Sequence, residues 1–437
     1  MRRGCLILAA GLLALSGAGR ATETDGANPY PIRLVRPTAA PLSAMAQLGR
    51  AIFFDRFLSA SGRQSCASCH DPANHYAPTV GQPAMLGGAD LREQGDRATP
   101  SLTYLERQPP FSIGPDKDDQ DQPPSLNAMV ALGRDVARAV KTVGVEAPGA
   151  PVPQGGLFWD GRVDTLQQQA LHPLLNPVEM AGSEGAVAAR LRGARYAWRF
   201  VPLFGPAILD DAERLVSEAM FALARYQIED VSFHSYTSKF DFWLEGRARL
   251  APAELRGYRA FNDPLRGNCA GCHVDRAGRD GQPPRFTDGQ FEALGAPRNP
   301  ALANTRDPGF FDLGLCGPFR SDLRAQTQYC GMFLTPTLRN VAMRHAFFHN
   351  GVFHSLRAVL DFYNDRDVAP DKVYPRAGDG SVARFDDVPV AYRRNVDVED
   401  PPFDRNPGDA PAMSAADETD IIAFLGTLTD GYRPSGR

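Results

Sequence analysis

The sequence lacks any run of about 18 consecutive apolar residues, which excludes a multi-span membrane protein. It also lacks a basic excess: 47 lysines and arginines stand against 51 acidic residues, the net charge is −4, and nothing favours nucleic acid as a partner. No apolar–polar alternation is sustained, so extended β-sheet is not expected. With 437 residues, 43% of them hydrophobic, the chain is long enough for two or three globular domains.

The first residues have the three-part form of a secretory signal. Arg2 and Arg3 precede an apolar run from Cys5 to Leu15, and small residues follow. We expect residues 1–21 to be a cleaved signal peptide; a retained membrane anchor is the alternative. The mature protein would then work in an oxidising compartment, most simply a bacterial periplasm.

Four of the seven cysteines fall in two identical patterns, Cys-x-x-Cys-His at 66–70 and at 269–273. This spacing is typical of haem c, because two thiols add to the haem vinyl groups and the adjacent imidazole binds the iron. A zinc site or a redox dithiol would have to produce the same histidine offset twice. We therefore predict two covalently bound haem c groups, held by Cys66, Cys69 and His70 and by Cys269, Cys272 and His273.

Two further cysteines, Cys316 and Cys330, lie in a loop-rich stretch. In an oxidising compartment a disulfide that closes this loop is the simplest interpretation. Metal binding by this pair is the weaker alternative.

The fold class is predicted as mainly α, with two cytochrome c-like haem domains and long loops. Apolar residues at helical spacing predict helices over 42–54, 211–230, 252–261 and 414–428. We place the N-terminal domain at 22–240 and the C-terminal domain at 241–437. A surface insertion is expected at about 106–156; it carries an acidic run at 116–121 and a short helix at 125–140.

Several ordered motifs resemble the bacterial di-haem cytochrome c peroxidase and MauG family. They are the run at 158–180, which begins Phe-Trp-Asp-Gly-Arg, and the segments 286–289, 335–342 and 348–351. The resemblance implies that the N-terminal haem, with His70 as proximal ligand to the iron, meets hydrogen peroxide. The second haem, with His273 as first ligand, would be six-coordinate and store an oxidising equivalent.

The same resemblance implies a distal pocket over the first haem. Glu179 would move a proton between the peroxide oxygens, Gln169 would orient the peroxide, and Pro173 would shape the pocket. Trp159 matches the tryptophan that relays electrons between the two haems. The alternatives are that Glu179 caps a helix or faces solvent, and that Trp159 is a buried core residue.

The other two tryptophans, Trp198 and Trp243, are expected to be buried core residues.

The second ligand of the C-terminal haem distinguishes the branches of the family. Peroxidases place a methionine 14 residues beyond His349, whereas MauG and its MbnH-type relatives place a tyrosine; here the position is Tyr363. A phenolate stabilises oxidised iron, while a thioether favours reduced iron. The resemblance therefore favours Tyr363 as an iron ligand, and Met332 and Met343 are rivals at unmatched offsets.

Two remaining histidines are weaker candidates, and a calcium site is left open. His75 could be a sixth ligand at the first haem but is otherwise a loop residue, and His349 is expected to lie near the haem without binding iron. The family commonly holds calcium between its haem domains, yet the position of its asparagine ligand is Ala98 here. Carbonyl groups at 344 and 346 could still bind the ion, and the Arg344 guanidinium could replace it, so calcium stays open.

Three functions follow from these observations. In the first, which Tyr363 favours, peroxide generates a high-valent di-haem state that oxidises tryptophan in a partner protein. In the second, a di-haem peroxidase reduces peroxide to water with electrons from a small redox protein. The third, a non-enzymatic electron carrier, fits least well, because Glu179 and Gln169 would have no use in it.

Overall fold

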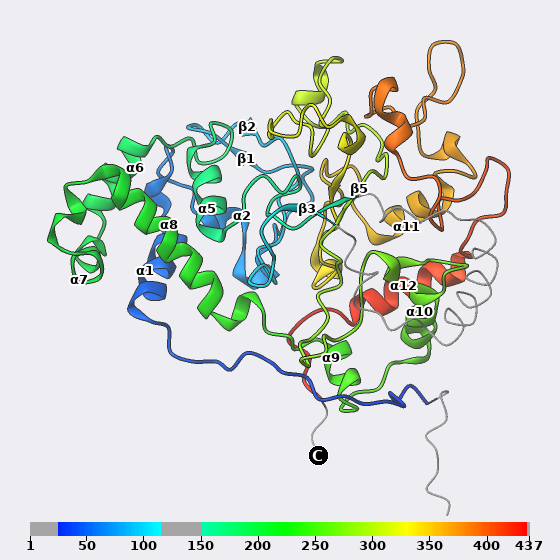
Figure 1. Cartoon of the computed structure of the whole chain (residues 1–437), viewed down its shortest axis with the longest axis horizontal. Helices are drawn as coiled ribbons and strands as arrows, with labels where there is room; N and C mark the ends of the chain where they lie inside the picture. Colours follow the sequence, from blue (N-terminus) through cyan, green and yellow to red (C-terminus); the bar gives the residue numbers. More distant parts are fainter. Residues whose placement is uncertain (1–24, 115–150, 435–437) are drawn as a thin grey trace, which may run out of the picture.

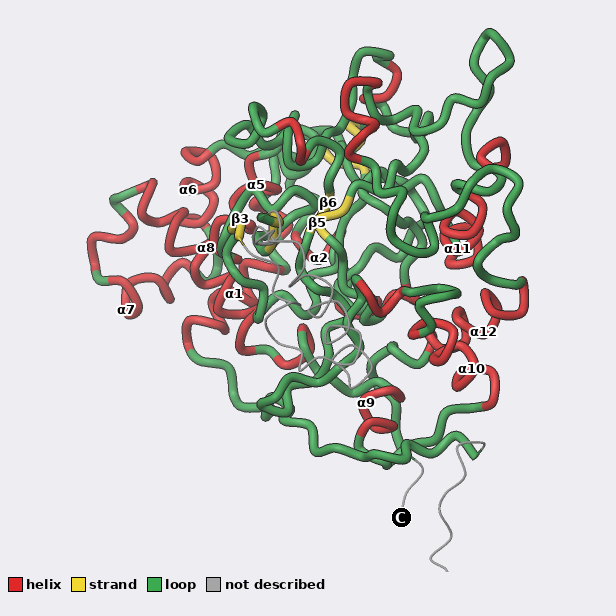
Figure 2. Tube along the Cα trace, turned by 45° about the vertical axis from the view of Figure 1, so that its right-hand side comes forward, coloured by secondary structure: helices red, strands yellow, loops and turns green. Residues whose placement is uncertain are grey.

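The structure is a computed structural model that describes residues 25–114 and 151–434. The expected signal peptide at 1–21, the acidic run at 116–121 and the helix expected at 125–140 lie outside the described residues. The described chain is mainly helical with a few short strands, and long loops join these elements (Figure 2), so the expected fold class is confirmed.

Helices gather at two ends of the molecule (Figure 1). The first group is α1 (Ala44–Phe53), α2 (Cys66–Cys69), α5 (Leu166–Leu175), α6 (Glu184–Gly193), α7 (Phe200–Phe204) and α8 (Ala212–Glu229). The second is α9 (Lys239–Leu244), α10 (Pro252–Asn262), α11 (Leu356–Asp365) and α12 (Ala415–Gly426). Short 3-10 turns occur at Arg56–Leu58, Pro72–Asn74, Ala197–Arg199, Pro206–Leu209, Val231–Phe233, Cys269–Gly271, Asn304–Arg306, Thr327–Tyr329, Val341–Met343, Pro370–Lys372 and Val390–Asn395.

The described strands form three antiparallel pairs: β1 (Leu86–Gly87) with β2 (Glu93–Gln94), β3 (Ser112–Gly114) with β4 (Val152–Gln154), and β5 (Phe291–Glu292) with β6 (Phe333–Leu334). The pair β3–β4 joins the two ends of the segment expected to be an insertion. The pair β5–β6 brings residues 291–292, which follow the second haem motif in the sequence, beside residues 333–334.

The helix boundaries follow from local sequence signals. Ser43 caps α1 by accepting a hydrogen bond from the Ala46 amide, and Asp211 caps α8 in the same way from Arg214. Ser414 and Asp417 form a capping box at the start of α12. The helices predicted at 42–54, 211–230, 252–261 and 414–428 are therefore confirmed to within two residues at each end.

Two large hydrophobic clusters form the cores. The first is built by apolar side chains of α1, α6 and α8, and the second by those of α10, α11 and α12. In both, a glycine lets two helices touch. A Cβ on Gly49 of α1 would lie 1.9 Å from the Ala222 carbonyl oxygen of α8, and one on Gly257 of α10 would lie 1.9 Å from the Asp420 carbonyl oxygen of α12. The helix before each haem motif is thus packed in the same way, with a glycine against the backbone of a partner helix.

Three further sequence predictions are tested by the fold. Cys316 and Cys330 form a disulfide with a Cα–Cα distance of 5.0 Å, as predicted. Trp243 is buried as predicted, but the same prediction for Trp198 is wrong: its side chain is 65% exposed. Trp198 lies in the 3-10 turn Ala197–Arg199 between α6 and α7, and its ring lies under the Arg199 guanidinium rather than in a core.

No helix among residues 25–114 and 151–434 is long and apolar enough to cross a membrane.

Candidate active site

The first Cys-x-x-Cys-His motif borders a cavity of about 140 Å³. The two cysteines of the motif are the first and last residues of α2, and His70 follows directly after that helix. The same cavity is lined by residues of α5 and of the turn after it, which the sequence predicted to form a distal pocket: Gln169, Pro173 and Glu179. The structure therefore brings the first motif and all three of these residues to one cavity.

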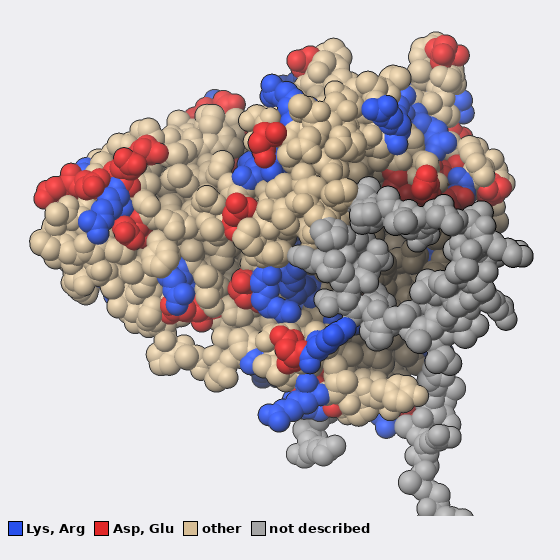
Figure 3. All heavy atoms as spheres, in the orientation of Figure 1, with Lys and Arg blue, Asp and Glu red and all other residues tan. Residues whose placement is uncertain are grey.

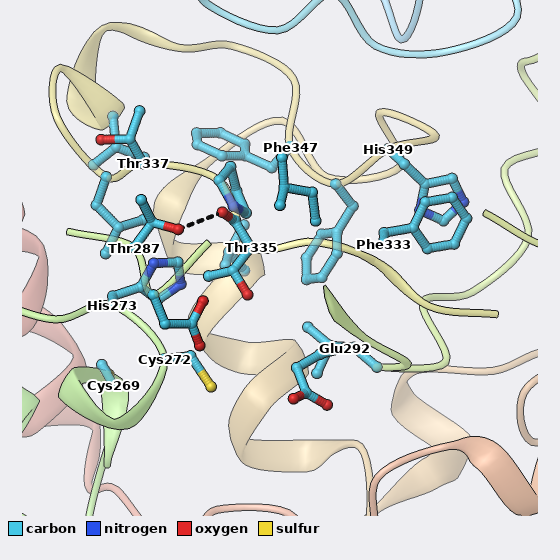
Figure 4. Close-up of a pocket in the computed structure, with 18 of the residues that line it drawn as sticks. Cys269, Cys272, His273, Thr287, Glu292, Phe333, Thr335, Thr337, Phe347 and His349 are labelled. Atoms are coloured by element: carbon cyan, nitrogen blue, oxygen red, sulfur yellow. Dashed lines mark hydrogen bonds between the residues drawn. The ribbon is translucent and has the colours of Figure 1, made fainter. Parts of the chain in front are cut away.

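The second motif borders a larger cavity of about 510 Å³. Its residues Cys269, Cys272 and His273 face the cavity together with Tyr363 of α11 (Figure 4 shows the motif side of it). Thr287 donates a hydrogen bond to the Thr335 carbonyl at 2.6 Å beside His273.

Both motif histidines are oriented in the same way. Nδ1 of His70 lies 3.2 Å from the Tyr76 carbonyl oxygen, and Nδ1 of His273 lies 3.1 Å from that of Phe286. A carbonyl only accepts, so each ring donates from Nδ1 and keeps its Nε2 lone pair for a metal. Burial lowers the pKa of both rings to about 4, which keeps them in the neutral form that binds iron.

The four motif thiols fit haem attachment better than the alternatives. Burial raises the pKa of Cys66 and Cys269 to about 12 and that of Cys69 to about 11, whereas a redox dithiol needs a lowered pKa. Within the part of the chain that the structure describes, no group of three or more His, Cys, Asp or Glu side chains is placed to hold a metal ion, as zinc would require. Two cavities, each with buried thiols and a free imidazole nitrogen, fit two haem c groups.

Glu179 is positioned by a tight turn after α5. Its Oε1 accepts a hydrogen bond of 2.7 Å from the Asn176 side chain, and no hydrogen bond to Oε2 is found among the described residues. Burial raises the pKa of Glu179, while the Asn176 hydrogen bond and the charge of Arg162 act in the opposite direction. A cavity-lining carboxyl with one oxygen free and a raised pKa can take up and release a proton more readily than an exposed one.

Tyr363 occupies the corresponding place in the second cavity. Its ring stacks on Phe403 with centroids 5.3 Å apart, and burial raises the pKa of its hydroxyl. No hydrogen bond of that hydroxyl is found within the described ranges. Neither Met332 nor Met343 is among the residues that line this cavity. Tyr363 is thus the better placed of the three ligand candidates.

Sequence reasoning overlooked one methionine in the second cavity. Met413 lies in the segment before α12, lines the cavity and is held by two hydrogen bonds between its backbone and the Asn364 side chain. Its distance from the family motifs along the sequence gave no signal that would have identified it.

Trp159 lies where the two cavities meet. It lines both of them, together with Phe158 and Gln169, and its side chain is 9% exposed. The indole Nε1 donates a hydrogen bond of 2.8 Å to the Ala98 carbonyl. The ring of Trp159 therefore lies between the two cavities.

A buried charge network fixes the turn that carries Trp159, and sequence reasoning missed it. Arg97 makes two hydrogen bonds to Asp312, of 2.6 and 2.7 Å, and one of 2.8 Å to Asp160. Arg162 makes a further ion pair of 2.9 Å with Asp160. Both arginines have delocalised charge that suits such bidentate pairing. The only signal in the sequence was the Asp and Arg that flank Gly161.

The two weaker histidine candidates lie as expected for residues that do not bind iron. His75 is in a left-handed turn and is not among the residues that line the first cavity. His349 is buried against the second cavity, and its ring stacks on Phe333 with centroids 3.5 Å apart (Figure 4).

The residues at the position where the family commonly holds calcium do not fit that ion. The side chain of Ala98 offers no oxygen, and its carbonyl accepts from Trp159. The carbonyl oxygens of Thr99 and Ala346 accept hydrogen bonds of 3.0 and 3.4 Å from the Arg344 guanidinium. A hard cation that needs six to eight oxygen ligands would have to displace this guanidinium.

These features define a class of protein, a c-type oxidoreductase with two haem sites. The family model described as "Di-haem cytochrome c peroxidase" matches residues 43–249. Methylamine utilization protein MauG of Paracoccus denitrificans is 37% identical over 328 residues, 74% of each chain. The chain belongs to the di-haem cytochrome c peroxidase and MauG family, whose members are peroxide-dependent oxidoreductases.

Two other relatives show the range of this similarity. Cytochrome c551 peroxidase of Nitrosomonas europaea is 27% identical over 363 residues, 81% of this chain and 83% of that one. The crystal structure of the diheme peroxidase BthA from Burkholderia thailandensis superposes with a TM-score of 0.74 at 35% identity, covering 93% of this chain and 94% of that one. The family implies two covalently bound haem c groups in this chain.

Proposed function

We propose that this enzyme uses hydrogen peroxide to oxidise a partner protein at tryptophan, in the manner of MauG and MbnH. The alternative from the same family is a peroxidase that reduces hydrogen peroxide to water with electrons from a small redox protein. We further propose that residues 1–21 are removed on export and that the enzyme works in the periplasm, with its halves divided near residue 240.

The observation that carries the proposal is the pairing of unlike cavities. The first cavity offers a carboxyl group, Glu179, whose free oxygen faces no hydrogen-bond partner within the described residues. The second offers a phenol, Tyr363, and leaves Met332 and Met343 outside its lining. The first arrangement suits reaction with peroxide, and the second suits storage of an oxidising equivalent.

Each residue then has a defined task. When bound, each haem supplies an iron that exchanges electrons with peroxide or with the other haem. His70 and His273 hold the irons through Nε2. Glu179 takes the proton from one peroxide oxygen and returns it to the other, which lets the O–O bond break with water as the leaving group. Gln169 orients the peroxide, and Pro173 shapes the wall beside it.

Tyr363 would hold the second iron as a phenolate, and this favours protein oxidation over peroxidase turnover. Burial raises the pKa of the free phenol, so the proton leaves only when a metal takes its place. A phenolate stabilises oxidised iron and lowers its reduction potential. The protein would then react with peroxide while both irons are oxidised, without an activating electron. Trp159, which lines both cavities, would carry electrons between them.

The charges visible on one face of the molecule do not by themselves select a partner. On the face shown in Figure 3 the described lysines and arginines are mixed with aspartates and glutamates, and neutral areas separate them. Electrostatic capture of a strongly charged small donor has no single-sign patch to use on this face. The choice between partner protein and small donor therefore depends on the haem chemistry.

The proposal is tested by mixing the fully oxidised holoprotein with one equivalent of hydrogen peroxide and no reductant. We expect a rapid spectral change. A secreted protein encoded beside this one is then added, and we expect a tryptophan of that protein to gain the mass of oxygen. The Glu179→Gln variant is the control and should show neither. A strict requirement for prior one-electron reduction, with turnover sustained by a small cytochrome, would support the peroxidase instead.

A further inference from the structure

Arg344 is a cation placed between the two cavities without an acidic partner. It lines the second cavity, and its Nη2 donates to Thr99, whose backbone borders the first. It follows the 3-10 turn Val341–Met343 directly, and its amide donates a hydrogen bond of 3.1 Å to the Val341 carbonyl. One side chain thus connects a loop of the second half with one of the first.

The guanidinium has carbonyl partners but no counter-ion. Its hydrogen bonds go to the Thr99 and Ala346 carbonyl oxygens at 3.0 and 3.4 Å, and no carboxylate pairs with it within residues 25–114 and 151–434. Arg97 and Arg339 differ, because each has carboxylate partners: Arg97 pairs with Asp160 and Asp312, and Arg339 pairs with Asp241. Burial alone lowers the pKa of Arg344 to about 10, with no neighbouring carboxylate to oppose it.

A buried unpaired cation is costly unless an anion joins it. Each haem c carries two propionate groups, and both cavities that would hold the haems reach Arg344 or its hydrogen-bond partner Thr99. The influence of this cation therefore extends to both haem sites.

We propose that Arg344 is a built-in cation that replaces calcium between the haem sites and is neutralised by haem propionates. It is a positioning residue: it fastens Thr99 to Ala346 across the two halves and sets the electrostatic potential at both irons. A chelator cannot remove the positive charge of an arginine side chain, so the enzyme is independent of calcium.

The test compares three variants of the holoprotein, after denatured mass has shown that each carries two haems. Arg344→Gln removes the charge and keeps part of the hydrogen bonding, Arg344→Lys keeps the charge, and Arg195→Gln removes an exposed arginine as a matched control. Midpoint potentials of both haems are measured by redox titration, and calcium is measured by elemental analysis before and after treatment with a chelator.

We expect the wild-type protein to hold far less than one calcium per chain and to keep its potentials when chelator or calcium is added. Arg344→Gln should lower both midpoint potentials, because a nearby positive charge favours reduction. Arg344→Lys should retain most of the wild-type values, and Arg195→Gln should match them. Adding Ala98→Asn to Arg344→Gln should create a response to calcium that neither wild type nor Arg195→Gln shows.

Two results would overturn the proposal: one calcium per chain in the wild-type protein, or potentials in Arg344→Gln equal to those of Arg195→Gln. If Arg344→Gln does not retain both haems, two other measurements test the proposal. It requires far less than one calcium per chain in the wild type, and potentials in Arg344→Lys that stay close to the wild-type values. These outcomes are independent of the partner that the enzyme oxidises, since none of the measurements involves turnover.

Discussion

The two cavities are alike around their motif histidines and unlike elsewhere in their lining. His70 and His273 each donate from Nδ1 to a backbone carbonyl, at 3.2 and 3.1 Å. Elsewhere in the lining, the first cavity presents Glu179 and Gln169, whereas the second presents Tyr363 stacked on Phe403. One scaffold therefore holds two cavities that differ in a few side chains, and our proposal assigns them different chemistry.

The shared part of the scaffold includes helix packing. Gly49 and Gly257 each allow a helix that precedes its haem motif to touch the last helix of its core. The lining residues that differ between the two cavities lie on α5 and the turn after it in the first half, and on α11 in the second half. The comparison teaches that the haem-attachment residues are what the two cavities share, and that the proposed difference in function depends on the other lining residues.

The largest effect is expected at Tyr363. Tyr363→Phe removes the only oxygen donor proposed for the second iron, so the two-equivalent oxidised state should be lost, while the reaction of the first site with peroxide continues. Tyr363→Met should raise the midpoint potential of the second haem, because a thioether favours reduced iron. Redox titration and rapid mixing with peroxide measure the two effects.

Met413 supplies the control for this experiment, because it lines the same cavity. If the cavity recruits it when the phenol is removed, Tyr363→Phe should show a thioether-bound haem and Tyr363→Phe/Met413→Leu should not. A sulfur ligand on the iron of the wild-type protein would contradict the role of Tyr363 and make the two distal sides more alike than we infer.

The next effect concerns Glu179. Glu179→Gln keeps the shape of the side chain but cannot accept a proton, so reaction with peroxide should slow by about 10²–10⁴-fold. Burial raises the pKa of Glu179 above its ordinary value, and the carboxylate is the form that accepts the proton. The wild-type rate should therefore fall as pH drops through that raised pKa, and the variant should lack this dependence.

Rapid mixing over a range of pH distinguishes this role from a structural one. A matched control is Gln168→Glu on α5, the helix before the turn that carries Glu179; the Gln168 side chain forms the capping box with Thr165. If Glu179→Gln and the wild type react at equal rates with equal pH dependence, the first cavity has no acid–base group and the contrast between the two distal sides fails.

The sequence was sufficient to predict the attachment side. Cys66, Cys69 and His70 lie within five residues, as do their counterparts, so no tertiary information is needed to bring them together. Helix caps such as Ser43 and Ser414 are local in the same sense, which is why the predicted helix bounds agree with the structure. The disulfide was predictable because only two cysteines were left over.

The contacts that the sequence did not reveal are those between distant segments. Arg97 and Asp312 are 215 residues apart, and nothing local identifies them as partners. Met413 reaches the second cavity only because Asn364 holds its backbone. Trp198 was expected in a core because tryptophan is mostly apolar, yet the turn between α6 and α7 leaves its ring on the surface. Distal geometry and surface position depend on the whole fold.

A smaller effect is expected at the two helix crossings. Gly49→Ala and Gly257→Ala each place a methyl group against a backbone carbonyl that cannot rotate away, so each should destabilise its own core by about 3 kcal/mol. The loss should appear in the unfolding transition followed through the nearer haem. Gly185→Ala in α6 is the matched control, since nothing lies within 4 Å of its added methyl group. Equal loss at both haems in either variant would show one cooperative unit in place of two cores.

The smallest effect is expected at the disulfide between Cys316 and Cys330, which lies in the second half. Cys316 and Cys330 enclose a loop with a sequence separation of 14, and Arg320 within that loop donates to the carbonyl oxygens of Asp160 and Gly161 at 3.0 and 3.1 Å. Opening the loop in Cys316→Ala/Cys330→Ala should cost about 2–3 kcal/mol of loop stability. The loop should then release the turn that carries Trp159, although neither haem attachment is touched.

Hydrogen exchange of the Leu334 amide measures this local effect, because it donates to the Trp159 carbonyl at 2.9 Å. We expect faster exchange there, unchanged denatured mass with two haems, and slower electron exchange between the irons after one-electron reduction. The Gln47 amide in α1, which is bonded to Ser43 in the other core, serves as the internal reference and should exchange at the wild-type rate. If exchange accelerates equally at both amides, the disulfide stabilises the whole molecule and does not act specifically on the path between the two haem sites.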